Sequence, residues 1–358
     1  MLLVYGGGSV IRTGTLARVK AQLIDAAKVV EFGGVQPNPE YTQLMEALPL
    51  IREHQLDFIL AVGGGSVVDG AKFIAAAAVW EGEPWDFLVR AQPHAGALPM
   101  GAVMTLPATG SEMNGVSVVS REETGQKLSF FSPYVFPKFS IVDPQLTETL
   151  PQRQVANGVV DAFVHVLEQY VVLEQFTPLQ ERFSEGVLLT LLEYGPRTYE
   201  DPKDEEARDA FCYAATMALN GLIGAGVVQD WSTHNIGHEL TALYGIDHAR
   251  SLAAILFDNI EQRWSLKRAR LAQLGRRVFS LDGEEEAVAK EAMKRIRAFF
   301  ESLDVPTSLG AYEAVHADVE ERVVRGLQAV GREHLGEKRS LSLDDVRALV
   351  AKSAARRP

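Results

Sequence analysis

The first part of the chain alternates between short apolar runs and segments in which apolar residues recur at helical spacing. The apolar runs predict strands at 2–5, 29–32, 58–62 and 100–106. The helical segments are marked by Leu16, Val19, Leu23 and Ala27, by Tyr41, Leu44, Leu48 and Ile51, and by the stretch 72–78. Such alternation of strand and helix is typical of a parallel sheet with helices on both faces.

The pattern changes near Pro151, after which nearly every segment has helical periodicity, as at Phe183, Val187, Leu188 and Leu191. A chain of 358 residues is too long for one small core and fits two domains. We therefore expect a dinucleotide-binding α/β domain at 1–149 and an all-helical domain at 150–358, with the boundary in the stretch 144–151.

Composition excludes several classes of protein. The net charge of −12 and the pI near 5.2 argue against a nucleic-acid partner, which would need a basic face. Cys212 is the only cysteine, so the chain has no internal disulfide and no cysteine-based zinc site. No apolar run reaches the ~20 residues of a membrane span, and the start lacks the features of a signal peptide. These observations predict a cytoplasmic protein with no membrane partner.

Two glycine turns follow predicted strands. Gly63, Gly64, Gly65 and Ser66 join a strand to a helix, where close backbone approach and free N–H groups make a phosphate cradle. We place Asp69 in the first turn of that helix. The alternative is a plain strand–helix turn, although ligands bind at this edge of open α/β sheets.

The second glycine turn, Gly6, Gly7, Gly8 and Ser9, bears on the choice of cofactor. NAD-binding sheets often carry an acidic residue at such a strand end to accept the ribose hydroxyls. This turn has none, which removes repulsion against a 2′-phosphate and favours NADP over NAD. Arg12 and Lys20 are the nearby candidates for a phosphate partner.

A third polar segment runs from Thr105 through Thr109 to Glu112 and ends a predicted strand. Its hydroxyl-bearing and small residues would line the nicotinamide and its ribose. A hydroxyl turn with a helix cap explains the same residues, and both can hold together.

The second half contains a candidate metal site. Asp161 and His165 lie four positions apart among apolar residues, so on a helix they share a face. His234 and His238 are again four apart, and His248 follows Gly245. One carboxylate with two or three imidazoles suits Fe²⁺ or Zn²⁺. A buried Asp–His hydrogen bond is the alternative, and spacing does not choose among the three later histidines. No His-Glu-x-x-His is present, which argues against a zinc peptidase.

In this order the motifs resemble the iron-containing (group III) alcohol dehydrogenases. The motifs are Gly-Gly-Gly-Ser, Thr-Leu-Pro-Ala-Thr-Gly-Ser-Glu, Ala-Asn-Gly-x-x-Asp-Ala-x-x-His, His-x-x-x-His and Gly-x-x-His. The likeness is greatest to the NADPH-dependent butanol dehydrogenase and aldehyde reductase branch, and it spans the chain from Tyr5 to about Val350.

The resemblance implies a Rossmann-like N-terminal domain and an α-helical metal domain, as in dehydroquinate synthase-like proteins, with the active site in the cleft between them. It implies a homodimer that interconverts primary alcohols and aldehydes with NADP(H) and one Fe²⁺ or Zn²⁺. Asp161, His165, His234 and His248 would bind the metal, which would act as a Lewis acid on the substrate oxygen. His238 would lie beside the nicotinamide and relay a proton. The cofactor residues would be Gly7, Gly8, Ser9, Asn38, Gly64, Gly65, Ser66, Asp69, Thr105, Thr109 and Lys127.

The sequence departs from this family in one respect. Members of this family carry a hairpin and a helix before the strand that here begins at Leu2, so we expect an exposed sheet edge and a loosened first domain. Three other functions are possible for a chain with these motifs. They are a glycerol-type polyol dehydrogenase, a sugar-phosphate cyclase and a non-catalytic nucleotide- or metal-binding paralogue. A cyclase needs several basic residues for a substrate phosphate, and Arg250 is the obvious one near the later histidines, which favours a neutral substrate.

Overall fold

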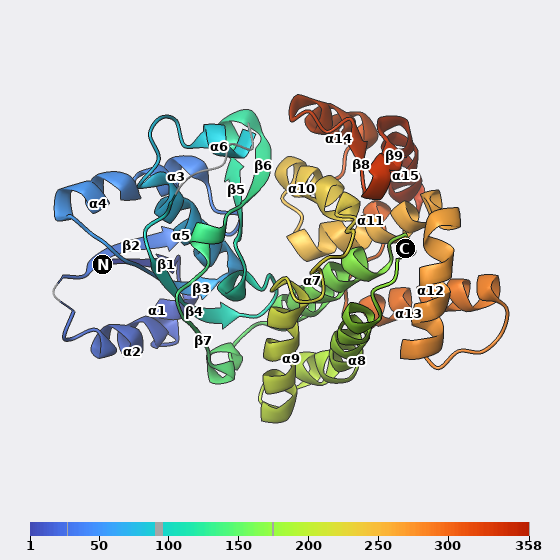
Figure 1. Ribbon diagram of the computed structural model, residues 1–358, viewed down its shortest axis with the longest axis horizontal. Coiled ribbons are helices and arrows are strands. Elements are labelled where there is room, and N and C mark those ends of the chain that lie inside the picture. The colour runs from blue at the N-terminus through green and yellow to red at the C-terminus, as the bar shows by residue number, and fades with distance from the viewer. Residues whose placement is uncertain (27, 90–95, 174, 358) are drawn as a thin grey trace. The chain divides into compact units, whose positions relative to one another are not determined.

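The structure is a computed structural model that describes residues 1–26, 28–89, 96–173 and 175–357. The chain divides into two compact units, Met1–Leu150 and Pro151–Pro358. The first is built on a sheet and the second on helices (Figure 1). This confirms the predicted fold class.

Unit 1 contains a five-stranded parallel sheet with the strand order β2-β1-β3-β4-β7. The strands are β1 (Leu2–Gly6), β2 (Val30–Val35), β3 (Ile59–Gly64), β4 (Met100–Leu106) and β7 (Ser140–Val142). The central strands are continuous apolar runs because both faces of the sheet are covered. The strand at Leu2 is interior, and the outer strand on that side is β2.

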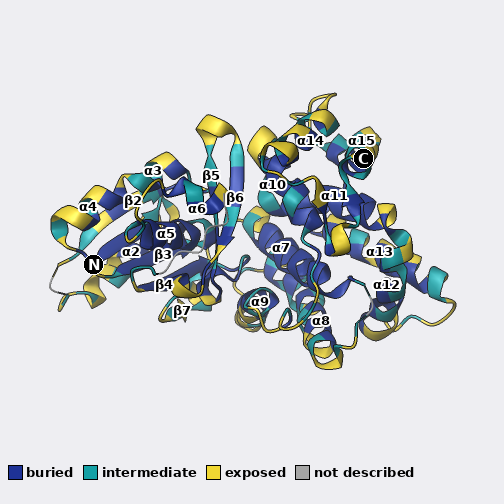
Figure 2. Ribbon diagram, turned by 45° about the horizontal axis from the view of Figure 1, so that its top comes forward, coloured by how far each residue is buried: buried dark blue, intermediate teal, exposed yellow. Residues whose placement is uncertain are grey.

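Helix α5 (Gly65–Ala77) is buried along nearly its whole length, as Figure 2 shows. It begins directly at Gly65, so Asp69 lies in its second turn and not in the first turn as we expected. The remaining helices of the unit are α1 (Ser9–Arg12), α2 (Thr15–Gln22), α3 (Tyr41–Met45), α4 (Ala47–His54) and α6 (Trp85–Val89). Ala27, the last position of the first predicted helix, lies outside the described residues.

Unit 1 differs from the predicted pattern in several places, and strand β7 and helix α6 were not predicted. The helix expected from Tyr41 to Ile51 is two helices, because Pro49 has no N–H to bond the Met45 carbonyl at the end of α3. An antiparallel hairpin, β5 (Val116–Arg121) with β6 (Gln126–Phe131), follows the Thr105–Glu112 segment and was not predicted.

Unit 2 is helical apart from a short hairpin of β8 (His334–Leu335) and β9 (Leu341–Ser342). Its helices are α7 (Gln152–Tyr170), α8 (Pro178–Glu200), α9 (Glu205–Ala218), α10 (Ser232–Tyr244), α11 (His248–Gln262), α12 (Trp264–Val278), α13 (Glu285–Ser302), α14 (Val319–Ala329) and α15 (Leu343–Ala355). Helix α7 packs against α8, α9 and α11 and is buried from Val155 to Tyr170 (Figure 2). Within the described residues, no helix has both the length and the apolar character needed to cross a bilayer.

Candidate functional site

Helix α7 presents Asp161 and His165 on one face, one turn apart. Both side chains are buried, and Nε2 of His165 lies 3.7 Å from Oδ1 of Asp161. Burial lowers the pKa of His165 to about 4. The imidazole is therefore neutral near pH 7, which is the form that binds a metal.

Helices α10 and α11 bring two further histidines to Asp161. Asp161, His234 and His248 each offer a ligand atom, and these atoms lie within 4.8 Å of one another. Nε2 of His248 lies 3.8 Å from Oδ1 of Asp161, the same oxygen that His165 approaches. His165 is outside the closest set of three, although its ring stacks on that of His234 with centroids 4.8 Å apart.

The residues fit a metal better than a plain Asp–His hydrogen bond. Distances of 3.7 and 3.8 Å are too long for a hydrogen bond. They are close to the ~3.3 Å that separates two ligands of a tetrahedral ion bound at about 2.0–2.1 Å. In the part of the chain that the structure describes, buried Oδ1 of Asp161 has no hydrogen-bond partner. Three imidazoles and a carboxylate suit Fe²⁺ or Zn²⁺.

His238 lies one turn beyond His234 on α10 and is buried. Its ring centroid is 5.1 Å from that of His248 and 6.3 Å from that of His234. It is therefore a neighbour of the candidate ligands, but it is not part of the set whose ligand atoms converge.

Glu168, also on α7, is a residue of this site that our sequence reasoning missed. Its carboxyl group is in hydrogen-bond contact with Nδ1 of His234 and accepts bonds from the backbone N–H groups of Thr233, at 2.7 Å, and His234, at 3.2 Å. Burial and the nearby charge of Asp230 raise the pKa of Glu168 to about 8. Its signal in the sequence was its position three residues after His165, on the same apolar helix.

Asp247, which directly precedes the candidate ligand His248, connects the start of α11 to α7. Its carboxylate accepts bonds from Nδ2 of Asn157, at 2.8 Å, and Nε of Arg153, at 2.7 Å. Burial opposes ionisation of Asp247, but these two bonds outweigh it, so the pKa of the carboxyl is lowered. Arg250 is buried, and it donates to Oδ1 of Asn157 at 3.1 Å and to the carbonyl of Asp304 at 2.9 Å. Its guanidinium therefore links α11 to α7 and to the segment at Asp304.

In unit 1, the Gly64–Ser66 turn joins β3 to α5 and lies against the segment after β4. A Cβ on Gly65 would come within 2.6 Å of Cγ2 of Thr109, and one on Gly64 within 3.1 Å of Cβ of Leu106. The glycines therefore allow a close approach that a side chain would prevent. Thr105, the next predicted residue, is buried within β4.

Three of the predicted cofactor residues meet although they are far apart in sequence. Nζ of Lys127 donates to Oδ1 of Asn38 at 2.8 Å, and the backbone N–H of Asn38 donates to Oγ of Ser66 at 3.3 Å. Asn38 has a φ of 56°, a left-handed conformation that Asn tolerates. The contacts place the Asn38 turn and the β6 residue Lys127 beside the start of α5.

Asp69 has a different environment from the other predicted cofactor residues. Its carboxylate accepts bonds from Oγ of Ser111 at 2.5 Å and from the N–H of Val118 at 3.1 Å. Fully buried Lys72 donates to Oγ of Ser111 and Oδ1 of Asn114, both at 2.9 Å, and burial lowers the pKa of Lys72 to about 8. Asp69 thus ties α5 to the segment that leads into β5.

The Gly7–Ser9 turn lies after β1, at the same edge of the sheet as the turn after neighbouring β3 (Figure 1). A Cβ on Gly8 would lie 2.7 Å from Nη1 of Arg12, so the guanidinium lies directly beside the turn. On β2, Glu31 is paired with Lys20 and accepts a bond from the hydroxyl of Tyr5 at 3.1 Å. Glu31 lies opposite Leu3, at the start of the strands and away from the turn, and its ion pair engages Lys20.

Both halves of the chain match one family of known proteins. Residues 1–144 match the family described as iron-containing alcohol dehydrogenase, and residues 155–354 match the C-terminal part of the Fe-containing alcohol dehydrogenase family. The chain is 48% identical over 351 residues to the NADPH-dependent aldehyde reductase YqhD of Escherichia coli, which covers 96% of this chain and 89% of that protein. It is 41% identical over 358 residues to the probable NADH-dependent butanol dehydrogenase 1 of Bacillus subtilis, with 99% and 92% covered.

Solved structures of alcohol and aldehyde oxidoreductases also match this chain over nearly its whole length. The crystal structure of YqhD from E. coli has a TM-score of 0.96 at 47% identity and covers 98% of this chain and 91% of that one. The NADH-dependent butanol dehydrogenase A of Thermotoga maritima has a TM-score of 0.94 at 32% identity, with 99% and 91% covered. The likeness therefore includes both units.

Proposed function

Because the chain belongs to the iron-containing alcohol dehydrogenase family, we propose that it is a metal-dependent oxidoreductase that interconverts primary alcohols and aldehydes with NADP(H). The observation that carries the proposal is the convergence of ligand atoms from Asp161, His234 and His248, with His165 beside them. The family membership confirms the resemblance that we noted in the sequence.

When bound, the metal supplies Lewis-acid polarisation of the substrate oxygen, and the nicotinamide supplies or accepts the hydride. The chain's residues hold and orient these groups. Asp161 and His165 from α7, His234 from α10 and His248 from α11 would hold Fe²⁺ or Zn²⁺. We assign His238 a role in the reaction itself, as the family resemblance implies, and its ring lies beside those of His234 and His248.

In unit 1, the start of α5 is suited to the pyrophosphate. Gly64, Gly65 and Ser66 leave room for close backbone approach at the N-terminus of a 13-residue helix, where N–H groups and the helix dipole favour an anion. The contacts of Asn38 and Lys127 with this turn support their assignment to the same cofactor site. Thr105 and Thr109 remain the proposed nicotinamide side of the site. The network around Asp69 supports a positioning role for this residue more than direct contact with the cofactor.

The names of the relatives give different cofactors, NADPH for one and NADH for another. The preference for NADP is therefore argued from the residues of this chain. Gly7, Gly8 and Ser9 carry no acid, and the guanidinium of Arg12 lies beside Gly8, where it can meet a 2′-phosphate. Glu31, the acidic residue on β2, is paired with Lys20. The lack of an acid at this turn and the guanidinium of Arg12 favour the 2′-phosphate of NADP over the ribose hydroxyl of NAD, whereas Lys20 is engaged by Glu31.

A neutral substrate is supported by the contacts of Arg250. A sugar-phosphate cyclase would need basic groups for the substrate phosphate, but this guanidinium is bonded to Asn157 and Asp304. A polyol dehydrogenase of the same superfamily would also take a neutral substrate, so the experiment has to separate the two.

The test is a panel of substrates assayed with NADPH and with NADH. We expect oxidation of NADPH with butyraldehyde and other short aldehydes, slower oxidation of NADH, and little activity with glycerol or phosphorylated sugars. A preference for glycerol with NAD would indicate the polyol dehydrogenase. Absence of turnover from metal-loaded protein with any of these substrates would indicate a non-catalytic paralogue.

We further propose a cytoplasmic homodimer. The cytoplasmic location is supported by the lone, buried Cys212, which allows no internal disulfide. The dimer rests on the family resemblance, and light scattering after size-exclusion chromatography tests it. A monomeric mass at micromolar concentration would contradict it.

A further inference from the structure

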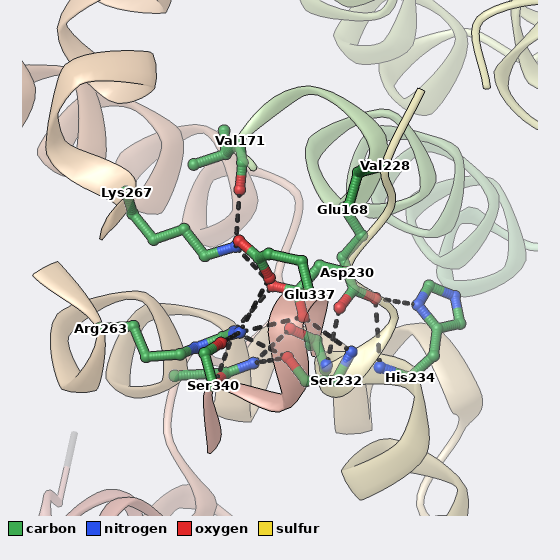
Figure 3. Close-up of polar contacts among 12 residues, drawn as sticks. Glu168, Val171, Val228, Asp230, Ser232, His234, Arg263, Lys267, Glu337 and Ser340 are labelled. Carbon is green, nitrogen blue, oxygen red and sulfur yellow. Dashed lines mark hydrogen bonds and ion pairs between the residues drawn. The ribbon is translucent and has the colours of Figure 1, made fainter. Parts of the chain in front are cut away.

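Glu168 stands between two parts of unit 2 that carry the candidate metal ligands. It lies on α7 with Asp161 and His165, and its carboxylate reaches the start of α10, where His234 lies (Figure 3). In Figure 3 the carboxylate meets both the ring and the backbone of His234. One acidic group therefore holds this candidate ligand at two points.

The first contact is with the helix terminus. Helix α10 begins after Trp231, which has a left-handed φ of 62° and makes no capping bond with its side chain. The N–H groups of Thr233 and His234, which have no acceptor within the helix, donate to the two oxygens of Glu168. Glu168, a residue of another helix, thus caps α10 together with Asp230, whose Oδ1 accepts a bond from the N–H of Ser232 at 3.2 Å.

The second contact fixes the chemistry of the imidazole. Because Nδ1 of His234 faces the carboxyl group of Glu168, Nε2 is the ring nitrogen that can face a metal. If Nε2 binds the metal, the ring proton lies on Nδ1, from which it is donated to the Glu168 carboxylate. Carboxylates in this position orient metal-bound histidines in many proteins, and their loss weakens metal affinity by about 10–100-fold.

A buried cluster of four charges holds the segments that Glu168 joins. Asp230 and Glu337 are the acids, and Arg263 and Lys267 are the bases. The backbone N–H of Asp230 donates to the carbonyl of Glu168 at 2.9 Å, and Lys267 donates to the carbonyl of Val171 at 2.8 Å. The cluster therefore ties the end of α7 to the segment that leads into α10.

The charges of this cluster sum to zero without Glu168. Its two acids are matched by its two bases, as the pairs in Figure 3 show. Within the described residues, the carboxyl group of Glu168 is bonded to Thr233 and His234 and not to a lysine or arginine, so it serves the start of α10 and not the charge cluster.

We propose that Glu168 is a positioning residue for the metal, fixing the tautomer and orientation of His234 through its bond to Nδ1 and its cap on α10. The proposal rests on the proposed function, since it requires that His234 binds a metal. Glu168 itself donates no ligand atom, and the charge cluster acts only by holding the segments on either side of it.

The test is the metal affinity of Glu168→Gln. The amide offers one acceptor oxygen and no charge, so it cannot serve Thr233 and the His234 ring together. We expect Zn²⁺ and Co²⁺ affinity, measured by competition with a chromophoric chelator, to fall by about 10–100-fold. The absorption spectrum of bound Co²⁺ should also change, because the geometry at His234 is no longer fixed.

Glu185→Gln is the matched control. Glu185 is also buried, and it accepts bonds from the hydroxyl of Tyr170 at 2.8 Å and from Arg277 at 2.8 Å, away from the ligands. We expect its loss to lower stability and leave Zn²⁺ affinity unchanged. If Glu168→Gln lowered only the stability of the metal-free protein, as loss of a cap alone would, the positioning proposal would be overturned.

Two further measurements separate the possible failures. If wild-type protein binds no metal, or His234→Ala keeps full affinity, the metal assignment in the proposed function fails. If His234→Ala loses the metal while Glu168→Gln keeps wild-type affinity, only the positioning proposal fails. Should Glu168→Gln not fold, ¹⁵N NMR of the Zn²⁺-loaded wild-type protein reads the tautomer directly. A proton on Nδ1 of His234 supports the proposal, and a proton on Nε2 contradicts it.

Discussion

At the scale of single residues, three histidines of α10 and α11 differ in what surrounds them. His234 contacts Glu168, and His248 lies near Oδ1 of Asp161. The ring of His238 neighbours the rings of both histidines. His234→Ala should therefore weaken metal binding on the order of 100-fold or more and abolish activity. His238→Ala should keep its metal and lose kcat on the order of 100-fold. Elemental analysis and steady-state kinetics of both variants check this. Loss of metal from His238→Ala would mean that the ligand set is wrong.

Arg12 provides the residue-scale test of cofactor choice. A charge-assisted bond to the 2′-phosphate contributes about 1.5–3 kcal/mol, so Arg12→Ala should raise KM for NADPH by about 10–100-fold. KM for NADH should stay nearly constant. Arg18→Ala on α2 is the control, because this exposed arginine lies 4.0 Å from Asp143 instead of beside the turn. Equal effects on both cofactors would contradict the assignment.

Part of the site could be predicted from these residues alone. Helical spacing in an apolar segment indicated Asp161 and His165, and glycines after strands indicated the two turns. The choice of His234 and His248 over His238 came from the family resemblance, because spacing treats the three alike. Glu168 escaped prediction since its partner His234 lies 66 positions away. A contact at that separation depends on how α7 and α10 pack.

At the scale of elements, the start of α5 depends on a residue without a side chain. Gly65→Ala would push Thr109 away from the turn, because the added Cβ would come within 2.6 Å of its Cγ2. We expect the affinity for NADPH, measured by fluorescence titration, to fall at least about tenfold, since the cradle loses its shape. Gly186→Ala on α8 is the control, because nothing lies within 4 Å of its added Cβ. Unchanged affinity in Gly65→Ala would argue against a cradle here.

The packing of α10 on α14 predicts a pH dependence of stability. Burial raises the pKa of Glu239 to about 7, and Arg332 opposes the shift. The folded protein therefore binds this proton more tightly than the unfolded chain does. Its contribution to stability is fully present below about pH 4.5 and is lost as the pH rises to about 7, a change of at most about 3 kcal/mol.

Glu239→Gln should flatten this part of the profile, because the amide does not ionise. Urea unfolding of wild-type protein and Glu239→Gln between pH 5 and pH 8 measures the effect, with exposed Glu333→Gln as the control. Parallel profiles for wild-type protein and Glu239→Gln would show that this carboxyl does not titrate as its burial suggests.

The elements themselves were predicted with uneven success, for physical reasons. Long periodic helices such as α7 and α10 and the fully apolar strands were clear, because burial imposes one pattern along their whole length. The division between α3 and α4 depends on a single hydrogen bond that Pro49 cannot make. The β5–β6 hairpin mixes apolar and polar residues over two six-residue strands, which is too short for periodicity to separate from a loop.

At the scale of the whole molecule, the two compact units carry different parts of the chemistry. The candidate metal ligands belong to Pro151–Pro358, and the cofactor turns belong to Met1–Leu150. A metal at 100 times its Kd stabilises the folded state by about 2.7 kcal/mol. Hydrogen exchange should therefore show added protection in α7, α10 and α11 with Zn²⁺, and around the glycine turns with NADPH. Metal-dependent protection confined to the sheet of unit 1 would contradict this division.

The proposed reaction requires the metal that Asp161, His165, His234 and His248 would hold. The most direct measurement follows butyraldehyde-dependent NADPH oxidation while the metal is removed by a chelator and then restored, with metal content determined in each sample. We predict that the rate falls in proportion to the metal removed and returns with Fe²⁺ or Zn²⁺, whereas His234→Ala stays inactive throughout. Full activity in protein shown to be free of metal would contradict the claim.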